Sequence, residues 1–256
     1  MSHDHTIVLT SYKRPDNLSR VLEGVFSQTF PHSRLVLVDN SPRHYRPRLR
    51  DLRHFDEVIR FNDNAGPCCR FLGAMFNDTE YTIFLDDDIA IGDKFVEACY
   101  HTSDVLEGKF STISGIGRTT VRTRKKSPFR GKNKMLKKNI QRLPEQRSID
   151  VTCRGHFFRS TDIGSALKYY QMAKSDGMGE SVLRNDDIFL SLGIQLDTGY
   201  KSYMTGTMDS GRRTKMNQSE LNSPFSCSSN DDHRSSRDRL VAWFNGLGWK
   251  PLRYKE

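Results

Sequence analysis

Three consecutive aspartates, Asp86-Asp87-Asp88, follow directly after the apolar run Tyr81 to Leu85. Carboxylate oxygens are the preferred ligands of hard cations such as Mg²⁺ and Mn²⁺, which in proteins often also bind the phosphates of a substrate. If the strand continues through the aspartates, Asp86 and Asp88 face one side and Asp87 the other. A metal and phosphate site is therefore one interpretation of the triplet, and a solvated acidic turn is the other.

A second acidic pair, Asp186-Asp187, precedes the apolar residues Ile188, Phe189 and Leu192. A carboxylate within hydrogen-bond reach of a hydroxyl can take its proton, and two adjacent like charges can raise one pKa toward neutrality. Acidic residues also favour the first turn of a helix, where they cap the free N–H groups. Catalysis and capping are compatible roles for this pair.

The elements that must position these residues follow an α/β rhythm. Strands are predicted at His5 to Thr10, 35–38, 58–61 and 81–85. One helix is predicted to begin at Pro15, and a second helix is predicted to contain the apolar residues Phe71, Leu72, Met75 and Phe76. The strands end in polar clusters: Thr10-Ser11, Asp39-Asn40, Asn62 to Asn64 and the aspartate triplet. Open α/β sheets bind ligands at the carboxyl ends of their strands, so this edge is the candidate site.

The second half of the chain is less regular. Helices are predicted at 93–103, 161–174 and 234–247, and strands at 112–116, 149–153 and 156–159. A short helix is predicted from Asp186 to Leu192, with Gly193 placed to end it. The polar stretch 217–232 is predicted to be a loop.

Four short motifs, in this order, resemble the nucleotide-sugar glycosyltransferases of the GT-A fold, with the family-two and exostosin-like enzymes as the nearest patterns. They are Thr10-Ser11-Tyr12-x-Arg14-Pro15, Val38-Asp39-Asn40-Ser41, Phe84 to Ile89, and Asn185 to Leu190, which is similar to the family's acceptor-side Glu-Asp motif. The resemblance covers residues 5–100 well and touches 150–195. It implies a single α/β domain with a mixed, mostly parallel sheet flanked by helices, carrying a basic insertion. Residues 1–100 would form the donor-binding half and 101–256 the acceptor-binding half.

The resemblance also implies roles for individual residues. Thr10, Ser11 and Arg14 would contact the nucleoside, and Asp39 its base or ribose. Asp86 would meet the ribose, Asp88 would bind the metal (Mn²⁺ or Mg²⁺), and Asp187 would act as general base with Asp186 beside it. Because this chain has Asp-Asp where the family has Glu-Asp, the choice between the two stays open, as does retention or inversion. The remaining implied donor contacts are Asn64, Gly66, Arg70 and Asp87.

Many GT-A enzymes supply a late histidine to the metal and late basic residues to the diphosphate. By resemblance, His233 is the candidate metal ligand and Arg234 and Arg237 are the candidate phosphate contacts. A helix start capped by Asp231 or Asp232 explains the same cluster without a ligand. His156, beside Gly155, is expected to be a satisfied, partly buried histidine rather than an acceptor contact.

The composition describes the rest of the molecule. The chain has 256 residues, a net charge of +9, no apolar run long enough to span a membrane and five cysteines without ligand spacing. Collagen-like and wholly disordered classes are excluded, and a reduced, cytoplasmic protein is expected (host cytoplasm, if a phage encodes it). Between Arg118 and Arg147 stand twelve Lys and Arg and one acid, so this segment carries +11 and the remainder about −2.

A basic segment of this kind favours a polyanionic partner. The predicted reaction is transfer of a sugar from a nucleotide sugar, expected to be a UDP-sugar, to a hydroxymethylated pyrimidine base in DNA. Alternatives are a cell-surface glycan or lipid-linked sugar as acceptor, a metal-dependent nuclease or nucleotidyltransferase, and a non-catalytic DNA-binding module. The oligomeric state is not predicted. The candidate DNA contacts are Arg122, Arg124, Lys125, Lys126, Arg130, Lys132, Lys134, Lys137 and Lys138.

Overall fold

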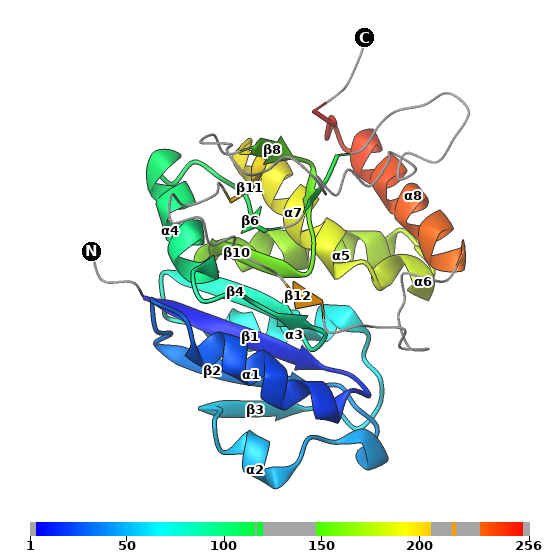
Figure 1. Cartoon of the computed structure of the whole chain (residues 1–256). Coiled ribbons are helices and arrows are strands. Elements are labelled where there is room, and N and C mark those ends of the chain that lie inside the picture. The colour runs from blue at the N-terminus through cyan, green and yellow to red at the C-terminus, as the bar shows by residue number, and fades with distance from the viewer. Residues whose placement is uncertain (1–3, 116, 120–146, 206–216, 219–230, 253–256) are drawn as a thin grey trace.

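A computed structural model of the chain describes residues 4–115, 117–119, 147–205, 217–218 and 231–252. Its centre is an eight-stranded sheet in the order β3-β2-β1-β4-β10-β6-β11-β8 (Figure 1). The strands span Glu57–Arg60 (β3), Arg34–Asp39 (β2), His5–Ser11 (β1), Tyr81–Asp86 (β4), Gly155–Arg159 (β10), Ile113–Ser114 (β6), Ser202–Met204 (β11) and Arg147–Ile149 (β8).

The sheet is mixed and mostly parallel. Strands β1 to β4 pair in parallel, as do β6 and β11, whereas β10 runs antiparallel to β4 and β6, and β8 antiparallel to β11. Two small sheets pair β12 (Asn217–Gln218) with β5 (Ile89–Ala90), and β7 (Gly117–Arg118) with β9 (Val151–Thr152). The predicted fold class is confirmed.

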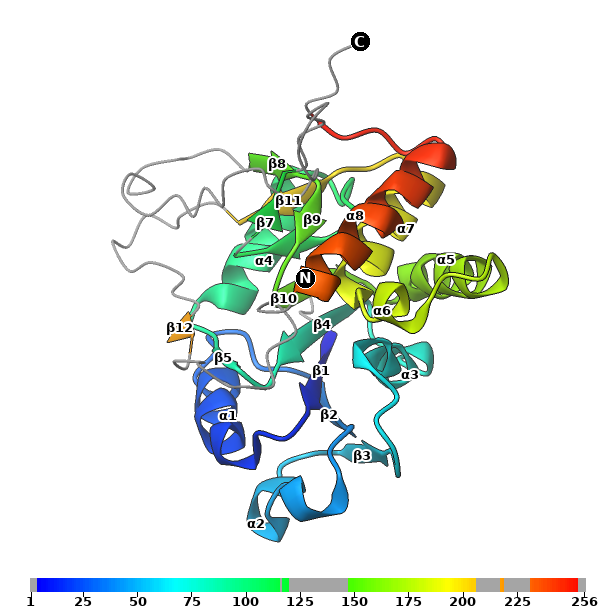
Figure 2. The ribbon, with the colours of Figure 1, turned by 90° about the vertical axis from the view of Figure 1, so that its right-hand side faces the viewer.

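Helices cover both faces of the sheet, as the two views in Figures 1 and 2 show. Side chains alternate along β1, so Ile7 and Leu9 enter one apolar core while Val8 enters the other. Burial on both faces is the reason these strands read as continuous apolar runs. The helices are α1 (Leu18–Phe26), α2 (Leu49–Leu52), α3 (Arg70–Met75), α4 (Phe95–Val105), α5 (Ile163–Ser175), α6 (Glu180–Leu183), α7 (Asp186–Thr198) and α8 (Asp231–Gly246). Short 3₁₀ turns occur at Pro15–Asn17, Arg43–Tyr45, Pro67–Cys69 and Ser160–Asp162.

The predicted end of the helix at Gly193 is wrong. Helix α7 continues to Thr198 and ends at Gly199, which adopts a left-handed conformation (φ 73°). Gly193 lies where α7 packs closely on α5: a Cβ there would stand 3.1 Å from Tyr169 Cδ2 and 3.2 Å from the Ser165 carbonyl oxygen. The glycine allows two helices to approach, and the sequence gives no sign of that neighbour.

Three other boundaries differ from the prediction. The strand predicted over 149–153 is interrupted at Asp150, a buried residue whose carboxylate accepts the backbone N–H of Leu252 (2.9 Å). In the stretch predicted as a loop, 217–218 pairs with β5, and α8 already begins at Asp231.

The described residues contain no helix that is long and apolar enough to cross a membrane.

Candidate active site

The strand register brings the predicted donor residues to one edge of the sheet. Thr10 is paired with Asp86 across β1 and β4, and Ser11 with Asp39 across β1 and β2. Because β10 runs antiparallel to β4, its first residue, Gly155, lies opposite Leu85 at this edge. The carboxyl ends of three parallel strands and the start of β10 therefore meet.

Arg14 contacts two of the three consecutive aspartates. Its Nη1 lies 2.6 Å from Asp87 Oδ1 and 3.2 Å from Asp88 Oδ2, and the Tyr12 backbone N–H donates to Asp87 Oδ2 (2.6 Å). Strand β4 ends at Asp86 and the next two residues form a turn. The predicted strand-like alternation is therefore wrong, because Asp87 and Asp88 share one guanidinium.

The three carboxylates have different environments. Burial raises the pKa of Asp87 to about 7, although Arg14 and the Tyr12 N–H act against it. Burial and the nearby charge of Asp86 raise the pKa of Asp88. Side chains of Asp86 and Asp88 keep 29% and 22% exposure, so their oxygens remain reachable by a ligand.

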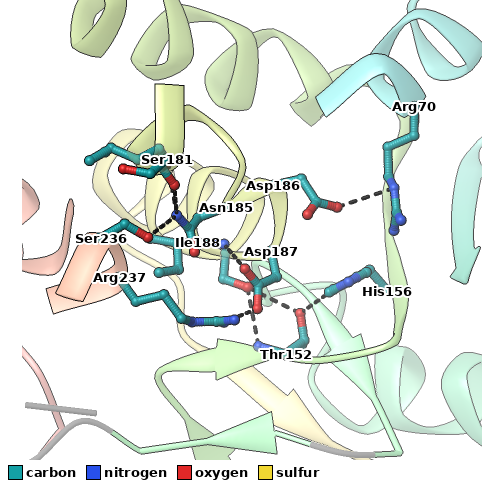
Figure 3. A network of polar contacts seen from close by, with 12 residues as sticks. Arg70, Thr152, His156, Ser181, Asn185, Asp186, Asp187, Ile188, Ser236 and Arg237 are labelled. Carbon is teal, nitrogen blue, oxygen red and sulfur yellow. Dashed lines mark hydrogen bonds and ion pairs between the residues drawn. The ribbon is translucent and has the colours of Figure 1, made fainter. Parts of the chain in front are cut away.

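Arg70 bridges the aspartate triplet and the second acidic pair. Its Nη2 lies 2.5 Å from Asp86 Oδ1. Its Nε lies 3.1 Å from Asp186 Oδ2, the contact that Figure 3 shows. The side chain is buried, and among the described residues its Nη1 has no hydrogen-bond partner. Burial raises the pKa of Asp186 to about 6, against the attraction of Arg70. Residues 100 positions apart thus form one site.

Asp187 is held from two sides at the start of α7. Arg237 of α8 forms an ion pair with its Oδ2, and the backbone N–H of Ile188 donates to its Oδ1 (3.0 Å; Figure 3). Burial alone would raise the pKa of Asp187, but Arg237, with His156 and Arg118, holds it below its ordinary value. The two neighbouring aspartates therefore differ in proton affinity, Asp186 being the more basic.

The loop after β3 is built around an amide network. Asn64 Oδ1 accepts from Asn40 Nδ2 (2.9 Å) and from the Gly66 N–H (2.9 Å), and its Nδ2 donates to the Tyr12 hydroxyl (3.1 Å). Gly66 has a φ of 76°, which a side chain would strain. Asn64 and Gly66 thus lie beside the motif that follows β1, and their contact with a donor stays a prediction.

The remaining predicted donor residues are buried. The Thr10 and Ser11 hydroxyls have no hydrogen-bond partner among the described residues. The Asp39 carboxylate is fully buried and accepts from Arg60 Nε (3.2 Å) and the Ser41 N–H (3.1 Å). Asp39 therefore holds the end of β2 in place, whatever it contributes to ligand binding.

His156 has a hydrogen-bond partner, as predicted, but it is fully buried rather than partly buried. Its Nδ1 lies 2.8 Å from Thr152 Oγ1, and burial lowers its pKa to about 4. Arg154, two residues earlier, was not predicted. It adopts a left-handed conformation (φ 72°), its carbonyl accepts the Asp86 N–H (3.4 Å), and its charge acts on Asp88. A non-glycine residue with positive φ has no local sequence signal.

Several predicted residues lie outside the description. The candidate DNA contacts between 122 and 138 fall in the undescribed range 120–146. His233 and Arg234 lie within α8, but their side chains are not described, so a metal or phosphate contact from them stays a prediction. Arg237 is described, and its guanidinium contacts Asp187 rather than standing ready for a phosphate.

Asp86 and Asp88 fit a hard cation by donor chemistry. Both present partly exposed carboxylate oxygens at the same edge. Within the described residues no group of three or more His, Cys, Asp or Glu could hold a metal ion. A cation here would therefore be bound by one or two carboxylates and completed by phosphates and water, which is the usual coordination of Mg²⁺.

No family model matches the sequence, and no curated protein is significantly similar to it. Solved structures of S. aureus TarS share its fold. TarS 1-349 in complex with UDP-GlcNAc superposes with a TM-score of 0.51 at 15% identity, over 94% of this chain and 66% of that one. A longer TarS chain gives a TM-score of 0.52 at 13% identity, over 80% of this chain and 35% of TarS. The chain therefore spans two thirds or less of these relatives, and the likeness confirms the predicted GT-A-type fold.

Proposed function

We propose that this protein is a glycosyltransferase that transfers a sugar from a nucleotide sugar to a hydroxyl group. The observation that carries the proposal is the meeting of two acidic groups, Asp86 to Asp88 and Asp186-Asp187, through the buried Arg70. One group lies at the edge where α/β sheets bind nucleotides, and the other offers carboxylates for a proton. A nuclease or nucleotidyltransferase is disfavoured because it would give the polar residues from Thr10 to Pro15 no ligand to contact.

The donor is proposed to be a UDP-sugar bound along the ends of β1, β2 and β4. Within the described part of the chain the Thr10 and Ser11 hydroxyls there have no hydrogen-bond partner, and Arg14 is held at the same edge by Asp87 and Asp88. The similarity to TarS, whose structure contains UDP-GlcNAc, supports this choice of nucleotide. A cation held by Asp88, Mn²⁺ or Mg²⁺, would supply charge stabilisation of the nucleoside diphosphate as it leaves.

The acceptor hydroxyl is proposed to lose its proton to Asp187, with Asp186 as the alternative. Asp187 is held ionised, so it is able to accept a proton at neutral pH. Asp186 is the stronger base, but its Oδ2 faces Arg70 at 3.1 Å. A direct displacement with inversion follows if either carboxylate acts as a general base on the acceptor.

The acceptor is proposed to be a hydroxymethylated pyrimidine base in DNA. The twelve cations between Arg118 and Arg147 support a polyanion. The first described residue of that segment lies near α7: Arg118 is on β7, which pairs with β9, and its charge acts on Asp187. A polyanion bound by the segment would thus be held near the proposed base. A target base would have to be flipped out or reached in the groove.

The test is a donor-consumption assay. The protein is incubated with Mn²⁺ and a panel of UDP- and GDP-sugars, with and without hydroxymethylated DNA, and free nucleoside diphosphate is measured. We expect release that rises with the modified DNA and is lost in Asp88→Ala. Release that DNA does not change would move the acceptor to a glycan or lipid-linked sugar.

Two further outcomes would contradict the proposed reaction. The first is an absence of nucleotide release together with an absence of stabilisation by UDP plus Mn²⁺ in thermal unfolding. The second is nicking of plasmid DNA with metal and without nucleotide, which is the behaviour of a nuclease. Thermal unfolding without any ligand serves as the check that each variant, Asp88→Ala included, is folded before its activity is compared.

A further inference from the structure

Helix α8 presents a cation from its buried face. Leu240, Val241 and Phe244 of this helix are fully buried in the core, and Arg237 precedes them by one turn on the same face. The Arg237 side chain is only 9% exposed. An apolar residue of similar length would pack here without the cost of burying a charge. Packing therefore gives no reason for an arginine at this position.

The start of α8 is docked onto the start of α7 by two consecutive residues. Ser236 Oγ accepts from Asn185 Nδ2 (3.3 Å), and Arg237 forms its ion pair with Asp187. Asn185 is fully buried, and its Nδ2 also donates to the carbonyl of Val182 (2.9 Å). Because both contacts fall on the first residues of the α7 turn, α8 fixes the direction in which the Asp187 carboxylate points.

We propose that Arg237 is a positioning residue that holds Asp187 in place and in its ionised form. The proposal rests on the proposed function, in which Asp187 takes the proton of the acceptor hydroxyl. Arg237 contacts one oxygen of the carboxylate and the Ile188 N–H donates to the other, so the two donors together favour one orientation of the carboxylate. This positioning role differs from the phosphate-binding role that the resemblance implies for Arg237.

Other charged and titratable groups also lie near Asp187 and influence its pKa. They are His156 from β10, Arg118 from β7, Cys153 between β9 and β10, and Asp186 on α7 itself. His156 is buried and stays neutral at working pH because burial lowers its pKa to about 4. Among the groups whose charge lowers the pKa of Asp187, Arg237 has the largest effect, and it is also the one in contact.

The experiment is a pH titration of the aspartate carboxyl carbons by NMR in the full chain, with Asp187→Asn to assign the signal. We expect the pKa of Asp187 in the unaltered protein to lie below the ordinary value of 3.8. In Arg237→Gln it should rise by about 1 to 3, the usual effect of removing an opposite charge in contact. Arg239→Gln on the same helix is the matched control, since Arg239 is exposed and contacts only Ser181 Oγ among the described partners (3.1 Å).

Arg237→Lys separates charge from geometry. It should keep the pKa of Asp187 low while losing the fixed orientation, so that kcat falls about tenfold or more without a shift in the pH profile. In Arg237→Gln, by contrast, the acid limb of the plot of kcat against pH should move to higher pH. Both kinetic measurements use the UDP-sugar and the acceptor that the donor-consumption assay identifies.

The titration needs no substrate, so it stands even if the transferase reaction fails. An Asp187 that titrates at or above 3.8 in the unaltered protein would overturn the positioning role. So would an Asp187 pKa that Arg237→Gln leaves unchanged. If Arg237→Gln does not fold, the unaltered protein and Arg237→Lys still decide the question.

Discussion

Replacing Arg70 by Met removes the cation that, among the described residues, contacts both acidic groups. The arginine side chain is 6% exposed, and its two partners, Asp86 and Asp186, come from β4 and α7. Methionine fills much of the same volume without a charge. The variant therefore leaves two carboxylates, on side chains that are 29% and 14% exposed, without the cation that contacts both of them.

We expect the free energy of unfolding to fall by about 3–5 kcal/mol at pH 8, the usual cost of removing one partner from a buried ion pair. The lower end is favoured because Asp86 keeps 29% exposure and some solvation. The loss should shrink on acidification. Asp186 already has a folded pKa of about 6, above its unfolded value of 3.8, so protonation favours the folded state as the pH falls. Without Arg70 this pKa rises further, and the charge repulsion disappears by about pH 5.

The measurement is urea unfolding followed by circular dichroism at pH 8 and pH 5. Arg48→Met is the matched control: Arg48 and Asp16 form an exposed pair, with side chains 56% and 79% accessible, for which a loss of about 0–1 kcal/mol is expected. If Arg70→Met cost no more than Arg48→Met, or cost the same at both pH values, Arg70 would not be a buried charge bridge.

Two further changes test other parts of the reasoning. Asp187→Asn should lower kcat for sugar transfer by about 10²–10⁴, the contribution of general base catalysis, and leave stabilisation by UDP plus Mn²⁺ intact; loss of nucleotide binding instead would place Asp187 in the donor site. Gly24→Ala should destabilise by about 1–3 kcal/mol, because its Cβ would lie 2.8 Å from the Ile91 carbonyl oxygen. Gly164→Ala should raise the free energy of unfolding by about 0.4–1 kcal/mol, because a Cβ at this position would have no atom within 4 Å. Chemical unfolding of both variants measures whether the two substitutions change the free energy of unfolding in opposite directions.

The sheet and its ligand-binding edge could be predicted from the sequence because their signals are local. Strands β1, β2 and β4 are short apolar runs buried on both faces, β3 is a partly exposed strand with Val58 and Ile59 facing the two cores, and each of the four ends in polar residues. Parallel pairing then places those ends side by side, which is a consequence of topology rather than of any long-range pattern. The register of Thr10 with Asp86 and of Ser11 with Asp39 follows from the same rule.

The partners of the charged residues could not be predicted, because they are set by packing between distant elements. Arg70 was predicted as a donor contact, yet its partner Asp186 lies 116 residues away in the chain, and Arg237 meets Asp187 through the docking of α8 on α7. The prediction that a helix ends at Gly193 is wrong for the same reason, because the role of this glycine depends on a second helix. Spacing along one helix carries no information about which other helix packs on it.

The charge balance of the site bears on how it would bind a nucleotide. Asp86 to Asp88 and the pair Asp186-Asp187 supply five carboxylates. They lie in contact with, or within electrostatic reach of, five arginines: Arg14, Arg70, Arg118, Arg154 and Arg237. Above the pKa of Asp87, which is about 7, an incoming diphosphate therefore adds negative charge to an edge whose charges already balance. Its binding requires either a divalent cation or the release of Arg14 from the aspartates, and only the cation leaves the ion pair between Arg14 and Asp87 intact. We therefore expect UDP to stabilise the protein far more strongly with Mn²⁺ than without it, and equal stabilisation in both conditions would point to Arg14 as the group that moves.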